Sequence, residues 1–234
     1  MLGYVQANLV VLPYDLAFEF LVLCQRNPKP CPILDVTEVG NFEPKLIAPG
    51  ADIRTDLPRY RVFRQGELVE EVSDIKSYWR SDLVAFLIGC SFTFENAMLN
   101  SELPVRHIAE GKNVPMYKTS IQCVSTQMFS SSLVVSMRPV PASKIVRTVE
   151  VTSRYYKAHG APIHIGNPEA IGIKALEKPD YGDAVTVKND EVPVFWACGV
   201  TTQAAILQAK PELAITHAPG HMFISDLKDE ALSF

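Results

Sequence analysis

Two stretches decide the fold: Pro193-Val-Phe-Trp-Ala-Cys-Gly-Val-Thr-Thr-Gln203 and Ile215-Thr-His-Ala-Pro-Gly-His-Met-Phe-Ile-Ser-Asp226. The first predicts a buried strand up to Ala197, then a small polar turn, then a helix from Gln203. The second begins inside another apolar run, 213–216, which predicts a strand that ends at the two histidines. A thiol, hydroxyls, an amide and two imidazoles thus follow strand ends, which is where open sheets bind their ligands. We therefore expect the functional site at these strand ends.

The composition is that of an ordinary globular protein. Of the 234 residues, 47% are hydrophobic and 21% are charged, which is enough chain for one large domain or two small ones. The formal net charge is −4 and the lysines and arginines are scattered, which argues against nucleic-acid binding. No apolar stretch approaches the ~20 residues of a membrane span. Gln6 and Asn8 interrupt the first apolar run, which is unlike a signal peptide.

The cysteines indicate a reducing environment. There are five of them, an odd number, and no two have the CxxC spacing. This pattern argues against both a disulfide framework and a zinc ribbon. We expect a cytoplasmic protein with free thiols.

Short elements joined by shaped loops are predicted, because many of the seventeen prolines border apolar runs. We expect strands at 4–11, 32–36, 59–64, 68–72, 82–90, 132–137, 163–165, 183–187, 192–197 and 213–216, and helices at 15–24, 91–99, 143–156 and 203–209. If residues 52–56 are extended, Asp52, Arg54 and Asp56 share one face. The pattern predicts an α/β fold with a mixed-sheet core domain and an inserted smaller α+β domain. The core domain is formed by 1–129 plus 188–234 and carries the site; the inserted domain spans 130–187.

A series of motifs along the chain resembles one known family. The motifs are Gly3-Tyr-Val-Gln-Ala-Asn-Leu9, Cys24-Gln-Arg-Asn-Pro-Lys-Pro-Cys-Pro32, Asp52-Ile-Arg-Thr-Asp56, Arg59-Tyr-Arg61, Gly89-Cys-Ser-Phe-Thr-Phe-Glu95, Arg106-His107, Asn113-Val-Pro-Met-Tyr117, Val135-Ser-Met-Arg-Pro139, His159-Gly-Ala-Pro-Ile-His164 and the two stretches quoted first. In this order, and over nearly the whole chain, they resemble the D-glutamate cyclase-like "putative hydro-lyase" family. The family usually has a further segment before the first motif and a proline where this chain has Thr202. We expect the second difference to loosen the turn that carries Cys198.

The resemblance implies an enzyme, a carbon–oxygen lyase that dehydrates D-glutamate to 5-oxo-D-proline in amino-acid metabolism. Such a cyclisation needs cationic partners for two carboxylates, a base for the ammonium, donors for the oxyanion and a proton for the departing hydroxide. Arginine suits a carboxylate because its planar guanidinium donates two parallel hydrogen bonds. We expect Arg54 and Arg138 to bind the substrate, since each follows an apolar residue near a predicted strand end. A structural ion pair is the alternative for each.

Histidine is the usual proton carrier near neutral pH, which makes His217 and His221 the candidate catalytic residues. They are four residues apart, but Pro219 and Gly220 lie between them, so they do not share a helical face. This spacing excludes the helical metalloprotease motif. The alternative is that either ring caps the backbone of a tight turn. From the inserted domain, His164 is a candidate substrate contact, with a structural role as its alternative.

The turn at Cys198 has three interpretations. The thiol is a small apolar group in the core, or a catalytic group whose pKa is lowered by a helix N-terminus, or a neighbour of an anion cradle formed by the backbone N–H groups that follow it. In the cradle interpretation, Gly199, Thr201 and Gln203 bind the substrate carboxylate or the oxyanion.

Two further motifs supply candidates. Ser91 and Glu95 open a helix after a buried strand, so Ser91 is a candidate substrate contact. Glu95 is either a catalytic base or an acid favoured by the helix dipole. Asn113 and Tyr117 stand in a segment typical of a pocket lining, with the core as the alternative.

The sequence therefore predicts a lyase for a small carboxylic or amino acid. The alternatives are a small-acid binding protein without catalysis, and an amide hydrolase that uses Cys198 with His217. We predict no metal site, because no ligand spacing demands one, although His217, His221, Glu95 and Asp56 leave a divalent ion open. The sequence names no cofactor. We expect no nucleic-acid or membrane partner, and a homodimer remains open.

Overall fold

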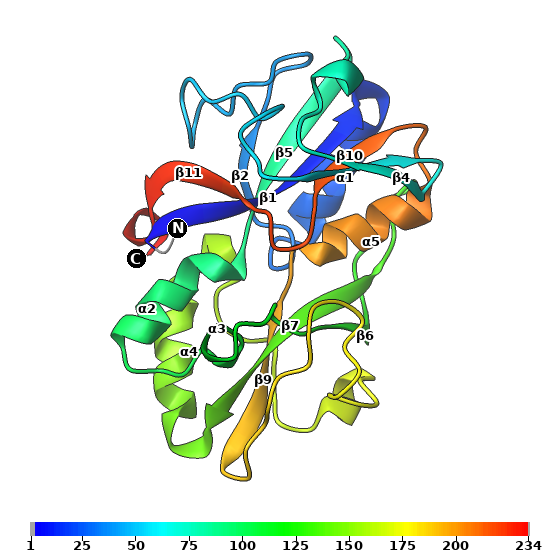
Figure 1. Ribbon diagram of the computed structural model, residues 1–234. Helices are drawn as coiled ribbons and strands as arrows, with labels where there is room; N and C mark the ends of the chain where they lie inside the picture. The colour runs from blue at the N-terminus through cyan, green and yellow to red at the C-terminus, as the bar shows by residue number, and fades with distance from the viewer. Residues whose placement is uncertain (1–2, 234) are drawn as a thin grey trace.

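The computed structural model describes residues 3–233 as two β-sheets with helices packed against them. The seven-stranded sheet occupies the upper half of Figure 1 and the four-stranded sheet the lower half. The strands of the first are β1 (Tyr4–Pro13), β2 (Ile33–Val36), β3 (Tyr60–Arg64), β4 (Glu67–Val72), β5 (Leu83–Gly89), β10 (Ala214–His217) and β11 (Phe223–Lys228), and those of the second are β6 (Met116–Gln122), β7 (Ser132–Pro141), β8 (His164–Ile165) and β9 (Glu191–Ala197). The α-helices are α1 (Tyr14–Arg26), α2 (Glu95–Asn100), α3 (Arg106–Ala109), α4 (Ile145–Ser153) and α5 (Val200–Ala209).

Strand β1 is the centre of the seven-stranded sheet. It pairs with β5 from Ala7 to Pro13, and on its other edge with β11 in its first half and β10 in its second. Its side chains alternate between the two faces, as the strand period requires. Leu9 and Val11 pack under the long loop 37–59. Val10 and Leu12 pack against α1 and α5 on the other face.

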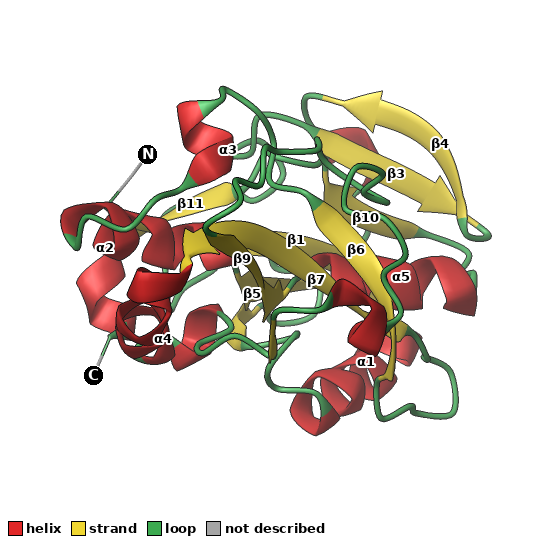
Figure 2. Cartoon of the chain, turned by 90° about the horizontal axis from the view of Figure 1, so that it is seen from below, coloured by secondary structure: helices red, strands yellow, loops and turns green. Residues whose placement is uncertain are grey.

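The four-stranded sheet is also covered on both faces. On β9, Val194 and Trp196 face α2 and α4, while Phe195 and Ala197 face the irregular segment that follows β8. Seen from below, α2 and α4 lie at one end of the molecule, and α1 and α5 at the other (Figure 2). Strand β9 leads directly into α5, so one continuous segment links the two sheets (Figure 1).

The α/β class and the presence of two regions are confirmed. The strands pair antiparallel throughout residues 3–233. The second sheet is wider than 130–187, because β6 and β9 are strands of it. The division into a core domain of 1–129 plus 188–234 and an inserted domain of 130–187 stays a prediction.

Three expectations about local structure are wrong. Residues 183–187 form no strand; the segment is fixed instead by polar contacts, such as the Asp183 carboxylate that accepts the Asn113 N–H at 2.9 Å. Residues 52–56 form a turn, in which the Asp56 N–H donates to the Asp52 carbonyl at 2.9 Å. The polar turn after β9 is already helical, because α5 begins at Val200. Strands β6 and β11 were not expected at all.

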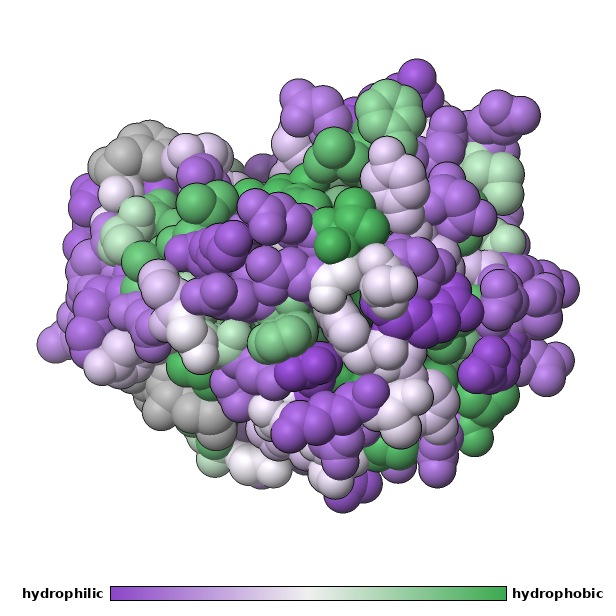
Figure 3. Space-filling view, turned by 90° about the horizontal axis from the view of Figure 1, so that it is seen from above, coloured by the Kyte–Doolittle hydropathy of each residue, from purple (hydrophilic) through white to green (hydrophobic). Residues whose placement is uncertain are grey.

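Hydrophilic and apolar side chains are mixed on the surface. On the face seen in Figure 3, hydrophilic side chains surround smaller apolar groups. Exposed large apolar residues come from different elements, for example Phe18 on α1, Leu46 in the long loop and Val146 on α4. Within residues 3–233, no helix is long and apolar enough to cross a membrane.

Candidate functional site

A small cavity lies where the two sheets meet, and we call it the central cavity. Its volume is about 40 Å³, room for a few water molecules at most. Five segments line it: Asn8 on β1, 90–92 after β5, 113–116 at the start of β6, 198–203 at the start of α5, and 217–222 after β10, with Tyr181 beside them. Both sheets therefore contribute to one site.

His217 ends β10 and is buried in the wall of the central cavity. Its Nδ1 lies 3.2 Å from the Leu9 nitrogen and 3.5 Å from the Leu9 carbonyl oxygen; the shorter contact, in which the Leu9 N–H donates, requires a lone pair on Nδ1. Burial lowers the pKa of His217 to about 4, which keeps the ring neutral at physiological pH. A neutral imidazole with a lone pair on Nδ1 carries its proton on Nε2. The ring is therefore a hydrogen-bond donor in the central cavity and not a ready base.

The first turn of α5 forms another wall. The Cys198 thiol donates to the Met116 thioether at 3.6 Å, and burial raises its pKa to about 11. The thiol is therefore protonated. A Cβ on Gly199 would lie 2.2 Å from the Asn8 amide nitrogen, so only glycine allows this close approach. The Thr201 hydroxyl accepts the Val134 N–H at 3.0 Å, and the Thr202 hydroxyl donates to the Gly199 carbonyl at 2.7 Å.

Gln203 lies one turn further along α5. Its side chain is buried and lines the central cavity, and its Nε2 has no hydrogen-bond partner. Buried amide groups without a partner are rare and costly, because they lose their hydrogen bonds to water. A ligand oxygen in the central cavity would satisfy this group.

Ser91 connects the central cavity to a buried charged cluster. Arg138 on β7 donates to the Ser91 hydroxyl oxygen at 3.1 Å and from Nε to Glu95 at 3.0 Å. His107 Nε2 lies 3.2 Å from the same Glu95 oxygen. Burial alone would raise the pKa of Glu95, but Arg138 and His107 outweigh it and hold this pKa below its usual value. Glu95 is thus an ionised structural partner of Arg138.

These features can be compared with known proteins. A family model described as D-glutamate cyclase matches residues 84–226, more than half of the chain. The chain belongs to the D-glutamate cyclase family. Proteins named "Putative hydro-lyase" match it along almost its full length, which places it in a family of carbon–oxygen lyases.

Three of these relatives come from bacteria. The protein from Geobacillus kaustophilus is 64% identical over 98% of this chain and 88% of its own. The one from Bacillus subtilis is 63% identical over 99% and 90%, and the one from Thermoanaerobacter pseudethanolicus 62% over 99% and 88%. A crystal structure of a nitrogen repressor-like protein from Methanococcus jannaschii is 11% identical, with a TM-score of 0.43 over 94% of this chain and 87% of that one.

Several residues predicted from the sequence come together in this D-glutamate cyclase family member. Ser91, Asn113, Cys198, Gln203 and His217 line the central cavity. Gly199 and Thr201 belong to the same first turn of α5. His221 is in the loop after β10, where its Nδ1 lies 2.9 Å from the Pro219 carbonyl. Their roles in binding or catalysis stay predictions.

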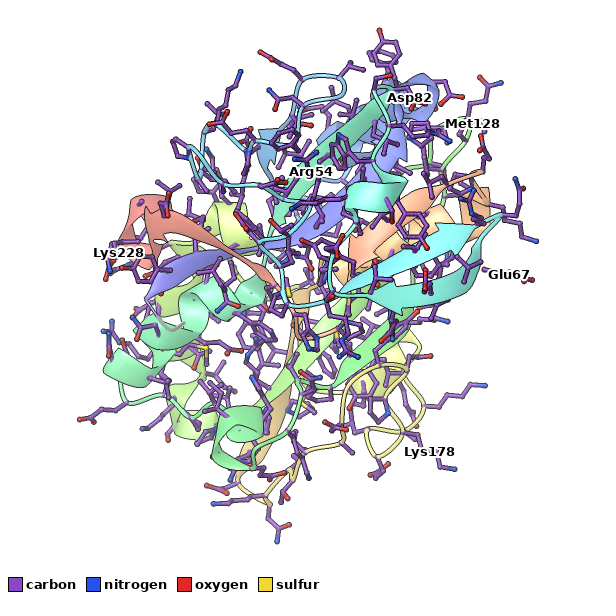
Figure 4. All side chains as sticks on the ribbon, turned by 45° about the horizontal axis from the view of Figure 1, so that its top comes forward. Arg54, Glu67, Asp82, Met128, Lys178 and Lys228 are labelled. Atoms are coloured by element: carbon purple, nitrogen blue, oxygen red, sulfur yellow. The ribbon has the colours of Figure 1, made fainter. Side chains whose placement is uncertain are left out.

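The other predicted residues have partners elsewhere. Arg54 donates twice to Asp52, at 2.7 and 2.8 Å, and lies on the long loop over the seven-stranded sheet (Figure 4). The Tyr117 hydroxyl donates to the Leu176 carbonyl at 2.7 Å, on the far face of the four-stranded sheet. His164 stacks near Phe195, and its Nε2 lies 2.7 Å from the Asn167 carbonyl. Arg138 and Glu95 stand behind Ser91 and not in the cavity wall. None of these five positions supports direct contact with a ligand in the central cavity.

Asn8 and Cys90 are cavity residues that sequence reasoning missed. Asn8 is a lone amide among apolar residues in the middle of β1, and its Nδ2 donates to the Gly89 carbonyl at 3.0 Å. A buried amide inside an apolar strand is a signal that could have identified it. Among residues 3–233, no three His, Cys, Asp or Glu side chains gather as ligands for a metal ion.

Proposed function

We propose that this protein dehydrates D-glutamate to 5-oxo-D-proline in the central cavity. One observation carries the proposal: the cavity is lined by neutral hydrogen-bond donors, while the neighbouring charged groups are paired behind its wall. The family membership supplies the reaction class, and the following steps assign roles to the residues present.

The charge balance of the reaction suits a neutral cavity. The C–N bond of the lactam forms, one C–O bond of the γ-carboxyl breaks, and two protons move from the ammonium nitrogen to the departing oxygen, which leaves as water. The reacting groups begin as one positive and one negative charge and end neutral. Removal from water disfavours both charges, so it favours the amine and the carboxylic acid, the forms that react. The ammonium can thus lose its proton to the carboxylate itself.

His217 and Gln203 are suited to stabilise the oxyanion. A neutral imidazole donates from Nε2 without giving up its proton, and the Gln203 amide has a free N–H for the same purpose. The Leu9 N–H fixes the His217 ring, and burial restricts the Gln203 side chain. Fixed donors cost little reorganisation when charge develops.

Ser91 is suited to carry a proton to the departing oxygen. Because Arg138 donates to its oxygen, the Ser91 hydroxyl hydrogen is free to point into the central cavity. Arg138 makes that hydrogen more acidic through its charge. Arg138 is thus a positioning residue in this proposal, and it keeps Glu95 as its partner.

The α-carboxylate of the substrate stays charged throughout and needs a partner of its own. The N-terminal end of α5 lines the central cavity and brings the positive end of its helix dipole there, while the Thr201 and Thr202 N–H groups donate to the Cys198 and Gly199 carbonyls. The cavity is smaller than glutamate, so the proposal also requires the segments around it to move apart on binding.

Amide hydrolysis through Cys198 is less well supported. A nucleophilic cysteine needs a thiolate and a nearby base. Here the thiol faces the Met116 sulfur and its pKa is raised to about 11.

The test is turnover of D-glutamate with L-glutamate as the control, followed as 5-oxoproline by chiral chromatography with and without a divalent metal. His217→Asn is the matched variant, because its amide oxygen still accepts the Leu9 N–H while the Nε2 donor is lost. We expect D-specific product, and a 10²–10³-fold lower kcat in the variant. Absence of product from the folded wild type would refute the reaction, and binding of D-glutamate without turnover would favour the binding-protein alternative.

A further inference from the structure

A second, larger opening lies apart from the central cavity. It has a volume of about 500 Å³ and is bounded by the loop 28–33 between α1 and β2 and by residues 153–161 after α4. We call it the lysine cleft, after Lys29 and Lys157 in its two walls. None of its lining residues is shared with the central cavity.

The two lysines give the cleft an unbalanced positive charge. In the described chain, no carboxylate lies within ion-pair distance of either ammonium group, whereas Lys45 and Lys112 each have an acidic partner. Both residues are exposed to solvent, and partial burial of the Lys29 ammonium lowers its pKa. Two ammonium groups without an acidic partner in one lining favour binding of an anion.

His159 lines the same cleft and ties its two bounding segments together. It is 1% exposed, and its Nδ1 lies 2.9 Å from the Lys29 carbonyl, while the ring also interacts with the backbone of Gly89. Its backbone is left-handed, with φ of +74°, which is uncommon for a residue other than glycine. Strained backbone is common at functional sites, where the surrounding structure holds it in place.

Apart from Ser153 and Tyr156, the rest of the lining is apolar. Pro28, Pro32 and Ile33 stand on one wall and Ala161 on the other. A fully hydrated inorganic ion gains nothing from such a surface, whereas an organic body buries apolar area against it. We propose that the lysine cleft binds a compact organic monoanion, a carboxylate on a small apolar body, with the carboxylate between Lys29 and Lys157.

The lysine cleft is separate from the site of the proposed reaction, but its wall packs against a strand that leads into the central cavity. A Cβ on Gly89 would lie 1.9 Å from the Lys157 carbonyl oxygen, so the wall of the lysine cleft packs directly on the end of β5. The next residues, Cys90 and Ser91, line the central cavity. A ligand in the cleft therefore sits behind the strand end that holds Ser91.

Benzoate is a suitable probe, because it carries one carboxylate on an apolar ring and lacks the amino group and second carboxylate of the proposed substrate. Titration of the full chain with benzoate, followed by amide NMR, is expected to shift resonances of 28–33 and 153–161. Benzamide, which lacks the charge, is expected to bind at least tenfold more weakly. Inorganic phosphate, which lacks the apolar body, is expected to bind more weakly than benzoate.

Lys29→Gln and Lys157→Gln are each expected to weaken benzoate binding about tenfold, and Lys188→Gln, an exposed lysine outside the cleft, is the matched control. His217→Asn leaves benzoate binding unchanged, so this result separates the cleft from the proposed reaction. Shifts confined to other segments, equal binding of benzamide, stronger binding of phosphate, or an equal loss in Lys188→Gln would each overturn the proposal.

Discussion

The central cavity and the lysine cleft deal with charge in opposite ways. Each contains a buried histidine whose pKa burial lowers to about 4, His217 in the first and His159 in the second. Around His217 the groups are neutral, and the charge of Arg138 is paired behind the wall. Around His159 two ammonium groups stand unpaired at the opening. A closed neutral cavity suits a reaction that removes charges, and an open positive cleft suits reversible capture of an anion.

Substitution of Arg138 should cause the largest loss of stability, because it leaves a charge unpaired behind the central cavity. Arg138→Met leaves the Glu95 carboxylate buried opposite only His107, and removal of one partner from a buried ion pair costs about 3–5 kcal/mol. Urea unfolding measures this loss. The double variant Arg138→Met/Glu95→Gln should recover most of it, since no unpaired charge remains. A single variant as stable as wild type would contradict the buried pair.

The free energy of unfolding at acid pH should reflect the lowered pKa of His217 and of His159. Each has a pKa of about 4 in the folded chain against about 6.5 unfolded, so the unfolded state binds protons first as the pH falls. The stability they contribute is complete above about pH 6.5 and falls between 6.5 and 4, by about 3 kcal/mol for each ring at the lower limit. Unfolding free energies measured across this range should show a smaller slope in His217→Asn and in His159→Asn. Asparagine also suits the left-handed backbone at 159. Unchanged slopes in both variants would be evidence against neutral buried rings.

Ser91→Ala tests the connection between the cavity and the cluster behind it. The Arg138 bond to the hydroxyl is lost, but Glu95 and Ser136 still accept from the guanidinium. We expect a stability loss of about 1–2 kcal/mol and a kcat for D-glutamate lower by about 10²-fold, with KM little changed. A variant with full kcat would remove Ser91 from the proposed proton path. Ser136→Ala, which loses another bond of the same arginine, is the control for a purely structural effect.

Arg54→Ala should have the smallest effect. Its ion pair with Asp52 is near the surface and is worth less than about 1 kcal/mol. Because Arg54 does not line the central cavity, kcat and KM for D-glutamate should stay within about twofold of wild type. A large rise in KM would instead restore Arg54 as a substrate-binding residue and imply that its loop moves to the cavity.

Much of the fold could be predicted because burial leaves a clear pattern in the sequence. The apolar runs of β1, β5 and β9 and the helical pattern of α1 follow the period of their elements. Strand β6 alternates only weakly between apolar and polar residues, and β11 contains Ser225, Asp226 and Lys228, so neither stands out. Pairing between strands far apart in sequence has no local signal.

The candidate site shows the same limit. The sequence predicts that Cys198, Gln203 and His217 lie near one another because each follows a strand end, and all three line the central cavity. Arg54 and Arg138 are predicted from their chemistry alone, and this does not show whether a carboxylate of the chain is already paired with them. Asp52 and Glu95 do occupy them, and only the folded chain brings Glu95 to Arg138.

The central place of β1 has a consequence for how the chain folds during synthesis. Residues 4–13 are made well before 214–217 and 223–228, which pair one edge of this strand. Until those segments leave the ribosome, an apolar strand has an open edge, and such edges invite aggregation. Newly made chains of this protein should therefore depend on chaperones until residues 214–228 are made, and the Leu9 N–H gains its His217 acceptor only then.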